Sequence, residues 1–140
     1  MIGTRALAVA WIMLGPVVAA YGGEVSFQKD VYPVLQANCV ACHAPHGVGY
    51  ERSGFSVQTY ETLMKGTKYG AVITPGASDS SNLMWLLDHR GHASINMPKV
   101  CEGTSQESRK CAQASQSARW LSQHELILIK EWVDQGAKDN

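Results

Sequence analysis

Residues 39–43 read Cys-Val-Ala-Cys-His, within the longer run LQANCVACHAPHG. Two cysteines separated by two residues occur in redox dithiols, in zinc sites and in disulfide frameworks. When a histidine follows the second cysteine directly, the pattern also marks covalent attachment of haem. Each of these chemistries needs a different setting, so the rest of the chain can be used to choose among them.

The first three alternatives find little support in the sequence. A thioredoxin-like dithiol belongs to a β-α-β pattern, and the chain shows no convincing alternating strand. A structural zinc site needs four ligands, usually in two paired clusters, whereas Cys101 and Cys111 form no second C-x-x-C pair. A direct disulfide between Cys39 and Cys42 would be strained and is more often catalytic than structural. Covalent haem attachment is therefore the preferred interpretation.

The spacing of the motif has a physical reason under this interpretation. Two thiols one helical turn apart can reach two vinyl groups on one edge of a porphyrin, which assigns the thioethers to Cys39 and Cys42. The imidazole of His43 then meets the iron from one side. For the opposite side we expect Met97, because INMPKV is an irregular stretch in which this methionine has no periodic apolar partner. Pro98 restricts the backbone behind it.

Six other side chains could supply a sulfur or an imidazole to the iron, and most have a simpler role. The two methionines lie at helical spacing among apolar neighbours and are expected in the core. One histidine follows the proximal position too closely to reach the opposite face, and another is expected to be solvated in the first turn of the last helix. The histidines on either side of Gly91 stay open as alternatives. The six are Met64, Met84, His46, His89, His92 and His124.

The first twenty residues predict a secretory signal. Arg5 supplies a positive charge, residues 6–18 are apolar, and small residues lead to Ala20. Such an apolar run covers about 20 Å as a helix, which is short of the roughly 30 Å hydrocarbon core of a bilayer. We expect cleavage after Ala20, so that 1–20 is the signal and 21–140 forms one periplasmic or otherwise exported domain. An uncleaved membrane anchor is the alternative.

The charge of the chain limits which partners are expected. The two remaining cysteines bear on the stability of this domain. The chain carries 12 basic and 12 acidic residues without a basic stripe, so neither nucleic acid nor an anionic membrane surface is expected as a partner. In an oxidising compartment, Cys101 and Cys111 are expected to form a structural disulfide. Closing a loop of about eleven residues would contribute roughly 3 kcal/mol on the chain-entropy model.

Hydrophobic periodicity predicts an all-α fold with long loops. The best specified helix is the last one, in which Ser122 and Glu125 form a capping box and Gly136 closes the helix. In the first helix an N-cap at Asp30 would place Pro33 in the first turn. Residues 43–58 are expected to be a loop. The expected helices are Ser26–Cys42, Thr59–Lys65, a short helix starting near Ser80 or Ser81, and the helix after Ser122.

Taken together, these pieces resemble single-haem, class I-type bacterial cytochromes c and are similar in particular to planctomycete-type cytochrome c domains. The matching segments include FQKDVYPVLQANCVACH, NMP and LSQHELILIKEWVDQGAKDN, and they extend from about Phe27 to Asn140. The resemblance implies a cytochrome c-like fold of three to five short helices and long loops wrapped around one covalently attached haem c. It also implies that the first and last helices cross. The segment 99–120 is longer than in that family and carries the extra cysteine pair.

The function expected from the motif and the resemblance is that of an exported, soluble electron carrier with His/Met ligation and no substrate chemistry of its own. Its partners would be redox proteins that dock transiently at the haem edge. Two alternatives stay open. The chain could be a haem-bearing subunit of a larger exported oxidoreductase complex, or a haem sensor whose sixth ligand position is empty or weakly held.

Overall fold

The computed structural model describes residues 23–99, 106, 109 and 119–140. The expected signal segment and the expected Cys101–Cys111 disulfide lie outside the described residues. The helices, in chain order, are η1 Phe27–Val31, α1 Tyr32–Asn38, α2 Val48–Ser53, α3 Tyr60–Lys65, η2 Ser78–Ser80, α4 Asn82–Leu87 and α6 Gln123–Asp134. Within these ranges the only extended pairing is an isolated bridge between Thr67 and Gly70. The all-α prediction is therefore confirmed for the described part of the chain, none of whose helices is long and apolar enough to cross a bilayer.

The first helix begins differently from the prediction. Ser26, and not Asp30, is its N-cap, and the Ser26 hydroxyl accepts a hydrogen bond from the Lys29 N–H. The Asp30 carboxylate completes the cap by accepting from the Ser26 N–H at 2.8 Å. The chain then makes a π-helical turn, η1, before α1 starts at Tyr32. Pro33 does lie in the first turn of α1, where its missing N–H breaks no helical bond.

The predicted ends of the later helices are mostly confirmed. Thr59 caps α3 and Ser81 is the N-cap residue of α4. Ser122 and Glu125 form the expected capping box of α6. The prediction of a continuous loop over 43–58 is wrong, because this segment contains α2, which has a glycine at each end.

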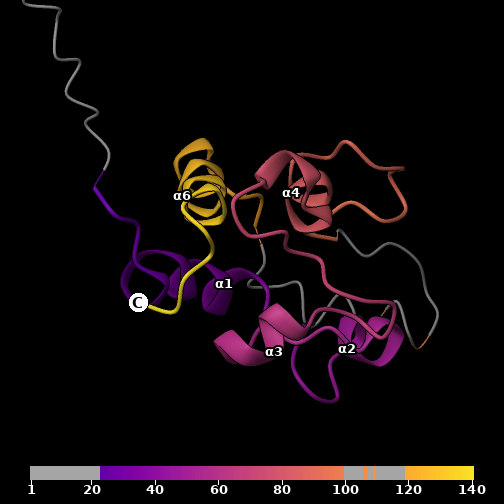
Figure 1. Cartoon of the computed structure of the whole chain (residues 1–140). Helices are drawn as coiled ribbons and strands as arrows, with labels where there is room; N and C mark the ends of the chain where they lie inside the picture. The colour runs from indigo at the N-terminus through magenta and orange to yellow at the C-terminus, as the bar shows by residue number, and fades with distance from the viewer. Residues whose placement is uncertain (1–22, 100–105, 107–108, 110–118) are drawn as a thin grey trace, which may run out of the picture.

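The η1–α1 segment and α6 pack against each other in the core, as the resemblance implied. Phe27 of η1 packs against Trp132 of α6 with ring centroids 5.3 Å apart, and both side chains are only 1 % exposed. After α6 the C-terminal tail returns to η1, where the Asn140 carbonyl accepts from the Gln28 N–H at 3.1 Å. Figure 1 shows this tail running from α6 to the start of the η1–α1 segment. The crossing of the first and last helices is therefore confirmed, and it leaves the end of α1 free to carry the Cys39–His43 motif.

Candidate functional site

The Cys39–His43 motif forms one tight turn at the C-terminal end of α1. The Cys39 N–H still donates to the Leu35 carbonyl at 2.8 Å, as a helical residue would. The Cys39 carbonyl then accepts from the N–H groups of both Cys42 and His43, at 3.1 and 2.8 Å. This turn places the two thiols close together, and neither is in a disulfide.

The first turn of α2 packs against this motif and is hydrogen-bonded to it. The N–H groups of Gly49 and Tyr50 both donate to the Cys42 carbonyl at 3.0 Å. A Cβ at Gly47 would collide with that carbonyl, and a Cβ at Gly49 would lie 2.7 Å from the Cε1 atom of His43. The two glycines therefore allow α2 to approach the motif more closely than residues with side chains would.

The backbone at Phe55 orients the His43 imidazole. The Phe55 carbonyl lies 3.3 Å from Nδ1 of His43, and the Phe55 ring meets the imidazole edge-on with centroids 5.3 Å apart. A carbonyl can only accept, so Nδ1 carries the proton and Nε2 keeps its lone pair. Burial lowers the pKa of His43, and the Phe55 hydrogen bond opposes this in part. The site thus presents a neutral imidazole whose Nε2 is available to a metal.

The two thiols are held in their protonated form. Burial, with a smaller contribution from nearby Cys42, raises the pKa of Cys39 to about 12. Burial also raises the pKa of Cys42. A redox dithiol or a zinc-binding pair works through thiolates, whose pKa values are lowered by their surroundings. In the described ranges no group of three or more His, Cys, Asp and Glu side chains is placed to hold a metal ion.

The donor set and its surroundings fit a haem. Two unpaired thiols lie one turn apart, and beside them is an imidazole with a fixed tautomer. Ten further apolar side chains pack against the core but are only partly buried, so they leave apolar surface that a large apolar group could cover. These side chains belong to Tyr32, Val34, Val40, Tyr60, Met64, Val72, Met97, Leu121, Leu126 and Leu128.

The structure places the backbone of Met97 against the C-terminal end of α4. The Met97 N–H donates to the Leu86 carbonyl at 3.2 Å, and its own carbonyl accepts from Nε2 of His89 at 3.0 Å. The peptide bond from Met97 to Pro98 is cis. The Met97 side chain is half-buried and packs against the core.

Among the other candidate ligands, Met64, Met84 and His124 lie where they were expected, in the core or exposed to solvent. Met84 is in the core with 1 % of its surface exposed, and Met64 is half-buried against the same core. His46, His89, His92 and His124 are exposed.

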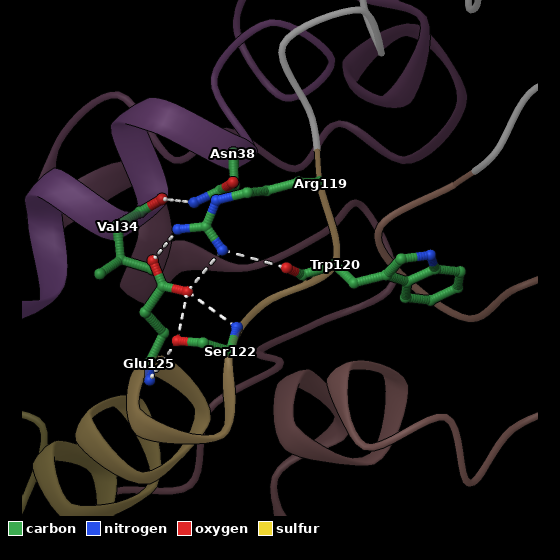
Figure 2. A network of polar contacts seen from close by, with 6 residues as sticks. All are labelled: Val34, Asn38, Arg119, Trp120, Ser122 and Glu125. Carbon is green, nitrogen blue, oxygen red and sulfur yellow. Dashed lines mark hydrogen bonds and ion pairs between the residues drawn. The ribbon is translucent and has the colours of Figure 1, made fainter.

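The sequence analysis predicted the Ser122–Glu125 capping box but not the Arg119 ion pair that joins it in one polar cluster. Arg119 donates through both terminal nitrogens to the Glu125 carboxylate and also to the Trp120 carbonyl at 3.1 Å. The same carboxylate accepts from the N–H of Ser122, so that one side chain serves both the ion pair and the helix cap. The bond from Arg119 is the largest of several effects that lower the pKa of Glu125 to about 2. Figure 2 shows this cluster at the start of α6, near Asn38 at the end of α1.

Two comparisons with known proteins show what the chain is similar to. Residues 39–99 match the family model described as planctomycete cytochrome c, which confirms the resemblance found in the sequence. The chain is also 27% identical, over 134 residues, to the hydrazine synthase subunit alpha of Kuenenia stuttgartiensis. That match covers 81% of this chain but only 15% of the relative, so the chain spans a small part of the relative's length. No solved structure matches the chain significantly.

Proposed function

We propose that this chain is an exported single-haem electron carrier. In this proposal Cys39 and Cys42 hold the haem covalently, while His43 and Met97 are the axial ligands. The observation that carries the proposal is the extent of the family match, which starts at Cys39 and ends directly after Pro98. It therefore includes all four residues that the motif reasoning selected. A haem held there would supply a one-electron couple between ferrous and ferric iron.

The residues of the site suit an electron carrier because none of them has to gain or lose a proton. The Phe55 carbonyl fixes the tautomer of His43, so the same nitrogen faces the iron in both redox states. A thioether such as that of Met97 has no proton to exchange, and His/Met ligation gives a higher potential than more basic ligand pairs. The chain would keep both ligands in place and tune the potential through burial.

The proposed function is tested by a redox titration of the purified holoprotein followed in the visible spectrum. The carrier is expected to show one reversible one-electron transition. Its ferric form is expected to show the weak far-red band of a thioether-to-iron bond, which Met97→Ala should remove. A ferrous form that is high-spin and binds CO readily would contradict the carrier and favour the sensor.

A second candidate function is that of a haem-bearing part of a larger exported oxidoreductase complex. The observation that favours it is the match to a hydrazine synthase subunit, which includes most of this chain. Size-exclusion chromatography of the native protein from its host, with elution monitored by haem absorbance, distinguishes the carrier from the subunit of a complex. Elution as a single small protein supports the carrier, whereas co-elution with an oxidoreductase supports the subunit.

A further inference from the structure

We propose that His89 is a positioning residue that sets the place of Met97 by holding its carbonyl. This inference rests on the proposed function, because it takes Met97 as the sixth ligand. It goes further by naming a residue that controls how firmly that ligand is presented. Three observations carry it: the hydrogen bonds of the Met97 peptide, the backbone conformation of His89, and the contact between His89 and Trp120.

The Met97 residue is held from both sides by the end of one helix. Its N–H donates to the Leu86 carbonyl at 3.2 Å, and its carbonyl accepts from Nε2–H of His89 at 3.0 Å. Leu86 lies in the last turn of α4, and His89 follows that turn directly. The Leu86 bond uses a backbone acceptor that any sequence offers. The His89 bond depends on one side chain, so it is the bond that evolution or mutation can change.

His89 adopts a backbone conformation that its residue type does not favour. Its φ is 56°, in the left-handed region that glycine populates most easily. A histidine kept at such a position is a reason to look for a role of the side chain. The bond from Nε2 to the Met97 carbonyl provides that role, because the left-handed turn after α4 is what brings the imidazole round to residue 97.

The imidazole also contacts Trp120, which lies just before α6. The ring of Trp120 meets it edge-on, with centroids 4.4 Å apart. Trp120 is itself held, because its carbonyl accepts from Arg119, which pairs with Glu125 in the first turn of α6. Figure 2 shows the Trp120 side chain pointing away from this cluster, on the side opposite Arg119. His89 therefore ties Met97 both to α4 and to the start of α6.

The test separates the donor, the ring and the backbone of His89 in the haem-loaded protein. His89→Phe keeps an aromatic ring against Trp120 but removes the donor, and His89→Gly also relieves the left-handed backbone. His89→Gln keeps a donor without the ring. His92→Phe is the matched control, since this exposed histidine of the same loop bonds Ser94 and does not bond Met97.

Three readouts report on Met97 without measuring electron transfer. They are the far-red thioether-to-iron band, the affinity of the ferric form for added imidazole, and the hydrogen exchange of the Met97 amide by NMR. One lost hydrogen bond should strengthen imidazole binding by up to about tenfold in His89→Phe and His89→Gly, with faster exchange and a weaker band. His89→Gln should stay within about twofold of the wild type, as should His92→Phe.

Three outcomes would overturn the proposal, and they differ in what else they overturn. If Met97→Ala removes the far-red band but the Phe and Gly variants behave like the wild type, the His89 proposal alone fails. If the wild type shows no such band, Met97 is not the ligand, and the His89 proposal fails together with the ligation in the proposed function. If His89→Gly keeps the wild-type band, imidazole affinity and amide exchange but is more thermally stable, His89 serves only to form the turn, and the proposal fails.

Discussion

A single backbone carbonyl, that of Phe55, decides which nitrogen of His43 is free. The sequence shows the Cys39–His43 motif directly, because its chemistry depends on residue types and spacing. It cannot show the part played by Phe55, since every residue has a carbonyl and only the folded chain brings this one to 3.3 Å from Nδ1. Gly49 was equally hidden, because in the sequence it reads as one more loop glycine.

Gly49 provides a prediction for the wall behind the haem ligand. In Gly49→Ala the new methyl group would lie 2.7 Å from the imidazole of His43. Overpacking of this kind costs about 1–3 kcal/mol, more than the roughly 1 kcal/mol that alanine gains over glycine in a helix. We expect a lower free energy of unfolding in urea. Gly23→Ala is the control, because a Cβ there meets no atom within 4 Å. Equal stability of the two variants would contradict the close approach of α2.

Among the helices, α6 was predictable from its capping box, whereas α2, which is held by tertiary contacts, was not. The capping box of Ser122 and Glu125 is a local pattern, and it is present in the structure as expected. The helix α2 has no side-chain cap, and its first turn is held by bonds from Gly49 and Tyr50 to the Cys42 carbonyl. No pattern within the six residues of α2 predicts these hydrogen bonds to the Cys42 carbonyl. The sequence predicted a helix over η1 but not its π-helical turn, although Ser26 caps it.

The start of α6 provides a prediction about pH. The pKa of Glu125 is lowered from 4.5 to about 2, first by the hydrogen bond from Arg119. A lowered pKa in the folded state adds stability above the unfolded value, and that stability is lost as the pH falls from about 4.5 toward 2. Glu125→Gln should therefore lose about 0.5–1 kcal/mol at neutral pH, where the pair is partly screened by solvent. The variant should also show a shallower loss of stability below pH 4.5.

Urea unfolding of the wild type and of Glu125→Gln at several pH values checks this predicted pH dependence of stability. Glu125→Gln keeps an acceptor for the Ser122 N–H, so that the comparison isolates the charge. If the stability difference stays the same at pH 7 and pH 2.5, the ion pair with Arg119 does not account for it.

The crossing of η1 and α6 provides a prediction about the core. Phe27 is 1 % exposed and its ring packs against both Trp132 and Tyr60, with centroids 5.3 Å from each. Phe27→Ala should lower the free energy of unfolding by about 3–5 kcal/mol, because it leaves a cavity between the helices. Ile127→Ala is the control on α6, since this side chain is 42% exposed. A similar loss for both variants in urea denaturation would contradict the packing described here.

For the described part of the molecule, the η1–α1 segment and α6 pack together, and the apolar core also takes side chains from the chain between them, such as Val57, Leu63 and Met84. The resemblance implied this packing of the first and last helices. The sequence did not predict the links from the Met97 segment to α4 and to the residues before α6, because they join residues with no common pattern, such as His89 and Trp120.

The charge of the whole molecule provides a prediction about docking. The chain has 12 basic and 12 acidic residues, so long-range steering of a redox partner would be weak. The rate of electron transfer to a partner should change by less than about threefold between low and physiological salt. Stopped-flow kinetics at several ionic strengths measure this. A steep fall of the rate with added salt would indicate a charged docking face.

The central claim is that Cys39 and Cys42 bind one haem covalently, and intact-mass spectrometry of the denatured protein tests it most directly. The protein should be made in a host that exports it and attaches haem. The account predicts a mass equal to the mature polypeptide plus one haem, and the polypeptide mass alone for the double variant Cys39→Ser, Cys42→Ser. A wild-type protein without the added haem mass, from a host that loads another cytochrome c in parallel, would contradict it.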